Sequence, residues 1–316
     1  MVFSNYRKAL FLFSWLPVLL VTVITGCATT VNVEVHRPPA MNTPGISRIA
    51  VIPFKTSSDK RIYTDLAAYA TGVATNRIRE TGYFVLEDPL LIQENEENNG
   101  SMADYADALF TGEIIMADYK TTGTIMPFIT PDGKKTIIQD YTTTVEVRIN
   151  YSLIRPADGS LIGMIQKNDK NKQSGPYTYS SASKLMKAVI DDQLRYLNRD
   201  LAPYIATETL TLAKDKSKDK TLKSEMKNAA ALVKVKNYST ALEYYLEIYF
   251  RHNSIAAARN ASILYEALGN VQSAADLMKQ VFIETGNTKV QEALARLDRV
   301  LEDRATLASN YKVDFR

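Results

Sequence analysis

Residues 142–154, with the sequence TTTVEVRINYSLI, decide the fold class of the first half of this chain. Apolar and polar side chains alternate there with a period of two, the apolar positions being Val145, Val147, Ile149 and Tyr151. This alternation predicts an antiparallel β-strand with one buried face. A turn-forming stretch, Pro156-Ala157-Asp158-Gly159, separates it from a second apolar segment at residues 161–166. We therefore predict a β-hairpin.

Upstream of this hairpin the sequence predicts a β-α-β unit. Residues 49–54, IAVIPF, form an apolar run too short for a helix, as in a buried strand. A helix face follows, formed by Ile62, Leu66, Ala70, Val73 and Ile78. Gly82 marks the end of that helix, and residues 83–86 predict the second strand. Residues 106–119 predict a further strand, and residues 179–205 predict an amphipathic helix that closes the unit.

These segments resemble the bacterial lipoprotein domains related to the curli secretion lipoprotein and to the lipoprotein activators of penicillin-binding proteins. The pieces that carry the resemblance are residues 48–55, 79–86, 106–115 and 145–165. The resemblance implies an α/β sandwich used for protein contacts or oligomer building, and it brings no catalytic residues. Curli-type pores also carry long membrane hairpins, and the comparable insert here is residues 121–139. Because this insert contains Pro127, Pro131 and Gly133, we expect it to supply no membrane strands.

The last ninety residues are helical in pattern and repeat after 33 residues. The first set is Leu232, Lys236, Tyr238, Ala241, Tyr245 and Ile248, and the second is Tyr265, Gly269, Val271, Ala274, Met278 and Val281. Small residues recur where two helices must approach, which resembles the tetratricopeptide pattern. In the register of that family, the residues facing a partner groove are Met226, Ala230, Lys234, Arg259, Ile263 and Glu266. Two repeats and a capping helix should lean on the α/β domain or on a partner.

The first thirty residues predict export and lipid attachment. Arg7-Lys8 precede an apolar run that ends in Ile24-Thr25-Gly26-Cys27, and the run is shorter than the roughly 20 residues of a membrane helix. Its end resembles the lipobox of bacterial lipoproteins. The resemblance implies cleavage before Cys27 and acylation of that cysteine. Ala28 follows it in place of the aspartate that retains enterobacterial lipoproteins in the inner membrane, so we expect outer-membrane residence on the periplasmic side.

Together these patterns predict an α+β fold, in which an α/β sandwich with a mixed, largely antiparallel sheet precedes an all-α tetratricopeptide-type array of helical hairpins. The expected organisation is a signal peptide at 1–26, a tether at 27–47, the α/β domain at 48–205, a charged connector at 206–223 and the helical domain at 224–316. His36 falls in the tether, where it predicts a solvated loop residue.

Composition disfavours most catalytic and nucleic-acid functions. Lys and Arg number 38 against 35 Asp and Glu, which leaves no strong positive charge for nucleic acid. One cysteine excludes a disulfide framework and a cysteine-based zinc site, and the two histidines lie far apart in sequence. We expect no cofactor, no metal and no enzymatic activity.

The sequence therefore favours a non-catalytic scaffold or regulator of an envelope assembly, anchored to the membrane through Cys27. Its expected partner is an envelope protein, with a small homo-oligomer allowed. The alternative is a subunit of an oligomeric, curli-type secretion channel. A periplasmic hydrolase is a third and weaker hypothesis.

Overall fold

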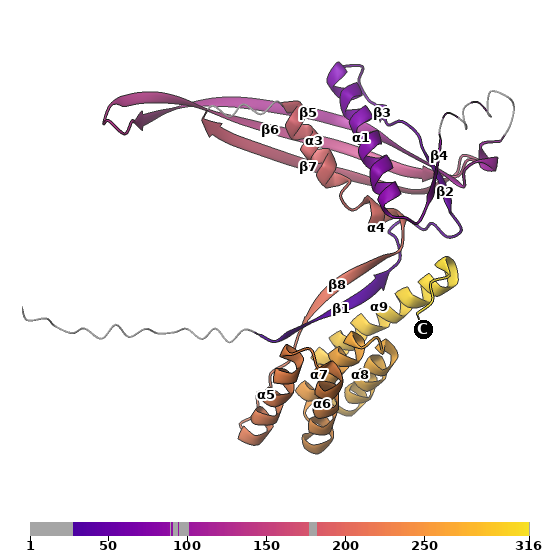
Figure 1. Cartoon of the computed structure of the whole chain (residues 1–316), viewed down its shortest axis with the longest axis vertical. Helices are drawn as coiled ribbons and strands as arrows, with labels where there is room; N and C mark the ends of the chain where they lie inside the picture. The colour runs from indigo at the N-terminus through magenta and orange to yellow at the C-terminus, as the bar shows by residue number, and fades with distance from the viewer. Residues whose placement is uncertain (1–27, 89, 91–93, 95–100, 177–181, 316) are drawn as a thin grey trace, which may run out of the picture.

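The computed structural model describes residues 28–88, 90, 94, 101–176 and 182–315. An α/β domain and a helical array are joined by a two-stranded ribbon (Figure 1). None of the described helices is both long and apolar enough to cross a membrane. The α+β class and the C-terminal helical array are as predicted.

The sheet of the α/β domain is mixed. Its strands are β2 (Arg48–Val51), β3 (Lys55–Thr56), β4 (Val85–Glu87), β5 (Ala108–Ile129), β6 (Lys135–Ile154) and β7 (Leu161–Pro176). The order is β4-β2-β5-β6-β7, with β3 also paired to β5. β2 runs parallel to β4 and β5, whereas β5, β6 and β7 are antiparallel, so the β-α-β unit and the hairpin are confirmed. A short 3₁₀ helix, η1 (Met102–Asp104), precedes β5.

Asp107 fastens the start of β5 to the start of β2. Its carboxylate accepts hydrogen bonds from the backbone N–H groups of Ser47 (2.9 Å) and Arg48 (2.8 Å) and from both side chains. Burial acts to raise the pKa of Asp107, but these hydrogen bonds outweigh it and lower the pKa to about 2.

Two helices cover one face of the sheet (Figure 1). α1 (Arg61–Glu80) buries Leu66, Ala70 and Ile78, and its chain turns at Gly82 with φ of +62°, as predicted. α3 (Ala182–Gln193) lies beside it over β6 and β7. The single helix predicted over residues 179–205 is wrong. α3 ends at Gln193 and a short α4 (Leu197–Leu201) ends before Pro203, which disfavours continued helix; residues 179–181 lie outside the described residues.

The insert at residues 121–139 is a continuous β-hairpin, which its prolines and Gly133 do not interrupt; that it supplies no membrane strands remains a prediction. β5 and β6 stay paired from Leu109↔Ile154 out to Ile129↔Lys135. Pro127 is tolerated because β5 is an edge strand at this point. Beyond Ile114, β5 is paired with β6 alone among the described residues, and an edge strand tolerates a missing N–H group. Figure 1 shows this hairpin projecting far from the helices that cover the sheet. We call residues 119–144 the projecting hairpin.

The predicted tether and connector contain two strands that pair with each other. β1 (Thr30–Arg37) runs antiparallel to β8 (Tyr204–Thr211), in register from Thr30↔Thr211 to Arg37↔Tyr204. A solvated tether over residues 27–47 is therefore wrong for β1, and His36 is a strand residue whose ring packs edge-on against Phe315. The charged connector is likewise wrong for its first six residues, 206–211. The physical reason for this strand is that Val31, Val33 and Val35 lie on one face of β1, and that face is buried against the apolar side chains of the helical array.

The array consists of five helices among the described residues. They are α5 (Lys220–Lys234), α6 (Tyr238–His252), α7 (Ile255–Ala267), α8 (Val271–Thr285) and α9 (Thr288–Tyr311). Each packs against the next in the chain. Ala241 and Ala274, the small residues of the repeat, are both fully buried. The assignment of these hairpins to the tetratricopeptide family remains a prediction.

Candidate functional site

The face of the array that was predicted to receive a partner is partly filled by the chain's own ribbon. β1 packs against α7 and α9. Val31, Val33 and Val35 are each 1% exposed and belong to the same apolar core as the five helices. Since a two-stranded ribbon is marginal alone, burial of this valine face stabilises both partners.

Charged side chains join the ribbon to the helices. Arg37 of β1 is paired with Glu208 of β8 and with Asp303 of α9. Arg296 of α9 donates to Glu208 (3.0 Å) and to Glu266 of α7 (2.9 Å). Burial opposes the charge on Arg296, yet its two carboxylate partners raise its pKa. Of these side chains only Glu266 is fully buried, so removing Arg296 would leave the charge of Glu266 uncompensated.

The far end of α9 contacts the α/β side of the molecule. The Tyr311 hydroxyl accepts a hydrogen bond from the backbone N–H of Thr43 (3.0 Å), and Thr43 is fully buried. The Tyr311 ring also lies 6.5 Å from that of Tyr83. These contacts and the ribbon connect the array to the α/β domain.

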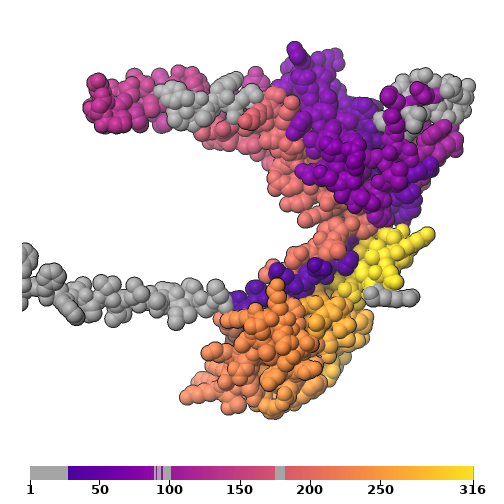
Figure 2. Space-filling view, in the orientation of Figure 1, coloured from indigo at the N-terminus to yellow at the C-terminus, as the bar shows by residue number. Residues whose placement is uncertain are grey.

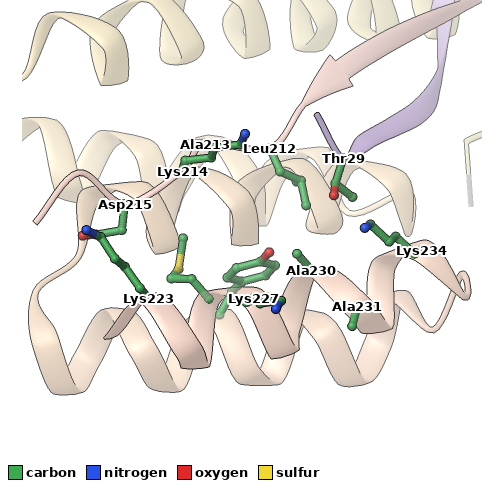
Figure 3. A pocket seen from close by; sticks show the side chains of 12 residues that line it. Thr29, Leu212, Ala213, Lys214, Asp215, Lys223, Lys227, Ala230, Ala231 and Lys234 are labelled. Carbon is green, nitrogen blue, oxygen red and sulfur yellow. The ribbon is translucent and has the colours of Figure 1, made fainter. Parts of the chain in front are cut away.

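A pocket of 410 Å³ lies between α5 and the chain that enters and leaves the ribbon (Figure 3). We call it the α5 pocket. Apolar side chains from α5, from α6 and from the residue after β8 form the floor of this pocket, and four lysines lie at its rim. The floor residues are Leu212, Met226, Ala230 and Tyr245, and the lysines are Lys214, Lys223, Lys227 and Lys234. Burial raises the pKa of the Tyr245 hydroxyl to about 12, so this side chain stays neutral.

The six residues predicted to face a partner do not share one groove. Met226, Ala230 and Lys234 line the α5 pocket. Arg259 and Ile263 line a separate pocket of 260 Å³ beside the end of β8. Glu266 is 3% exposed and is bonded to Arg296, so it serves the internal network. The ribbon divides the surface that the repeat pattern predicts as continuous.

Asn260 is a structural residue of this site that sequence reasoning missed. Its amide accepts a hydrogen bond from the Ala213 N–H (2.7 Å) and donates to the Ala213 carbonyl (3.0 Å). The side chain thereby pairs with one backbone residue as a neighbouring strand would, and it fixes the wall of the α5 pocket. The available signal was an asparagine inside a helix that is otherwise rich in alanine.

The projecting hairpin offers a second candidate surface. Its outer end exposes Ile125, Met126, Phe128, Ile129 and Ile137, with exposures from 44% to 69%. Contiguous exposed apolar side chains of this kind mark contact sites more often than isolated ones do. Figure 2 shows the hairpin and the array extending to the same side of the molecule from the joint between them.

Metal and acyl sites are not part of the described geometry. Among the described residues, no group of three or more His, Cys, Asp or Glu side chains could hold a metal ion. His252 instead faces Glu225, with 3.0 Å between Nε2 and Oε2. Cys27 lies outside the described residues, so its acylation remains a prediction.

Comparison with known proteins finds no matching family model and no matching curated protein. Among solved structures, a PelC dodecamer from Paraburkholderia phytofirmans is similar at 17% identity and a TM-score of 0.28, over 52% of this chain and 96% of that one. Lipoprotein GNA1162 from Neisseria meningitidis is similar at 13% identity and a TM-score of 0.24, over 46% and 96%. A minor lipoprotein from Acinetobacter baumannii gives 9% identity and a TM-score of 0.25, over 49% and 90%. Similarity this distant carries no argument about function.

Proposed function

We propose that this chain is a lipid-anchored, non-catalytic scaffold of the bacterial outer membrane, which holds an envelope protein at its projecting hairpin. The observation that carries the scaffold role is the exposed apolar end of that hairpin. The partner is a protein with an apolar contact surface.

The anchor is supported by the leader sequence. The only cysteine of the chain stands directly after the apolar run and a glycine, the position that the lipobox resemblance assigns to the acylated residue. Each buried methylene of an acyl chain contributes about 0.8 kcal/mol, so two or three chains hold a protein stably on the bilayer. The first described strand begins three residues later, at Thr30. The folded part would therefore stand close to the membrane surface.

The contact role is supported by the composition of the projecting hairpin. Its apolar side chains gather between Ile125 and Ile129 and at Ile137 and Ile138, near the tip. Towards the sheet they give way to polar residues, including Lys120, Thr122 and Asp140. An apolar stretch of five strand residues is about 17 Å long, roughly half of what a membrane strand needs. These dimensions favour a contact patch over a span.

The alternative, a subunit of an oligomeric secretion channel, is favoured by one observation. Residues 121–139 do form a long hairpin, and its tip lies on the same side of the molecule as the start of β1 (Figure 1). One observation argues against the channel. The neighbouring strand β7 carries Lys170 and Lys172, which pair with Glu146 and Thr144 of β6, and charged side chains are costly on the lipid-facing side of a membrane strand.

Photo-crosslinking in intact cells tests the scaffold role. A photoreactive phenylalanine analogue at Phe128 should form a discrete adduct with a second polypeptide, identified by mass spectrometry. The matched control is the same analogue at Lys279, which is exposed on α8 and remote from the hairpin. Adducts only with lipid, or a ladder of this chain's own copies together with stepwise conductance in planar bilayers, would favour the channel.

A further inference from the structure

The segment from Ala213 to Asn237 is the most basic part of the described surface of the array. It contains eight lysines against three acidic residues. The lysines are Lys214, Lys216, Lys218, Lys220, Lys223, Lys227, Lys234 and Lys236, all of them exposed. Four of them line the α5 pocket. In the sequence, acidic residues alternate with some of these lysines and would partly cancel their positive charge. The electrostatic potential of this surface therefore depends on which groups the acidic residues contact in the structure.

Each of the three acidic residues is engaged within the protein. Asp215 accepts hydrogen bonds from the Ser217 N–H (2.7 Å) and the Ser254 hydroxyl (3.2 Å). Burial acts to raise the pKa of Asp215, but these bonds and the nearby charge of Lys223 prevail and lower it. Asp219 caps α5 by accepting from the N–H groups of Thr221 and Leu222.

The third acidic residue is turned towards α6. Glu225 accepts hydrogen bonds from Arg251 (2.8 Å) and lies 3.0 Å from His252 Nε2. Among the described residues, none of the eight lysines lies within 4.0 Å of a carboxylate oxygen, although the charge of Lys223 acts on Asp215 and helps to lower its pKa. The other seven lysines, all of them exposed, therefore present their charge to the outside.

The position of the α5 pocket in the chain indicates what this charge meets. Thr29 lines the pocket, and Cys27 precedes it by two residues. Two residues of extended chain reach at most about 7 Å. A lipid on Cys27 would therefore bring the pocket into the layer of phospholipid headgroups. Figure 3 shows Thr29 and Lys234 at one end of the pocket and Lys223 with Asp215 at the other.

We propose that the α5 pocket binds the headgroup of an anionic phospholipid in the membrane that carries the Cys27 anchor, with the phosphate on the lysines and the glyceryl end over the apolar floor. This inference rests on the proposed lipid anchor. It assigns α5 to the membrane surface and makes the orientation of the array depend on membrane charge. The charge and the apolar floor together match a headgroup better than either does alone.

Lysine footprinting tests this inference with the full lipidated protein. The protein is reconstituted in vesicles of phosphatidylcholine alone or of phosphatidylcholine with phosphatidylglycerol, treated with an amine-acylating reagent and analysed by mass spectrometry. A lysine near an anionic membrane surface favours contact with that surface about fivefold over contact with water. Lys223, Lys227 and Lys234 should therefore be acylated about fivefold more slowly in the anionic vesicles than in the neutral ones. Lys279 on α8 serves as the internal control, and its rate should be the same in both. High salt should remove the protection.

Charge reversal gives the matched test. The double variant Lys223→Glu with Lys227→Glu should still enter both kinds of vesicle through its anchor, while Lys234 should lose its protection. The control variant, Lys279→Glu with Lys289→Glu, should keep it. Both pairs are exposed on helices, so neither is expected to disturb folding.

Three outcomes would overturn the inference. They are equal protection in neutral and anionic vesicles, no protection in either, and equal protection by soluble glycerol phosphate without anionic lipid. A failure of the anchor itself gives a different result, because the protein would then not be recovered with neutral vesicles.

Discussion

Shortening Val33 of β1 tests whether the array is built around the ribbon. Val33 is 1% exposed and lies in the middle of the valine face that packs on α7 and α9. Val33→Ala keeps the strand and its hydrogen bonds to β8 but removes apolar volume from the interface. Glu34→Ala is the matched control, because Glu34 is the next residue of the same strand and is exposed on the opposite face.

The expected loss follows from the burial of Val33. Removing two methyl-sized groups costs about 1.6 kcal/mol, at about 0.8 kcal/mol for each. The cavity left behind adds about 24 cal/mol for each Å³ that the surrounding side chains do not fill. We therefore expect Val33→Ala to lower the free energy of unfolding by about 2–3 kcal/mol, whereas the surface change Glu34→Ala should stay within about 0.5 kcal/mol.

Far-ultraviolet circular dichroism follows this effect, because most of the helix lies in the array. For a chain of this size, the expected loss lowers the melting temperature by about 3–5 °C. If Val33→Ala melts like the parent protein and like Glu34→Ala, then β1 does not stabilise the array. Residues 27–47 would in that case be the tether that their composition suggests.

Three further predictions address the anchor, the helix contacts and the junction of β2 with β5. Cys27→Ser should leave an uncleaved precursor that incorporates no labelled fatty acid in growing cells, and labelling equal to that of the parent would refute the anchor. Ala241→Leu and Ala274→Leu each add volume at a fully buried helix contact, so each should lower the free energy of unfolding by about 1–3 kcal/mol; melting unchanged in both would contradict the assigned contacts. Asp107 has its pKa lowered to about 2, so its stabilisation is complete above the unfolded value near pH 3.8 and is lost as the pH falls through about 2. Asp107→Asn should accordingly be less stable than the parent protein by about 2 kcal/mol at pH 7 in denaturant titrations. The difference in stability between the two proteins should vanish near pH 2. A difference that does not change with pH would contradict this account.

Elements that depend on local periodicity could be predicted from the sequence. The alternation in residues 142–154 predicted β6, and the apolar spacing from Ile62 to Ile78 predicted α1. The recurrence of Ala241 and Ala274 after 33 residues predicted where helices pack closely. In each case one buried face imposes its own period on a continuous segment, so neighbouring residues carry the whole signal.

The length of the projecting hairpin and the division of the groove depended on contacts across the fold. Pro127 argues against a strand unless the strand is known to lie at an edge, and that position depends on where β2 and β3 stop. Met226 and Arg259 belong to one surface in the repeat pattern, yet the end of the ribbon assigns them to different pockets. The acidic residues beside the lysines cancel them in sequence, whereas in the structure Glu225 is turned to Arg251.

The amino-acid sequence by itself determined the β-α-β unit, the first hairpin and the paired helices, because the pattern of each lies in consecutive residues, and it also predicts the leader that ends at Cys27. Only the tertiary structure decided that β1 pairs with β8 and that their valine face enters the array. The period-two pattern of Val31, Val33 and Val35 was present in the sequence, but such a short strand has no stability of its own. It becomes a strand because residues distant in the chain supply both its hydrogen-bonding partner and the apolar surface that it covers.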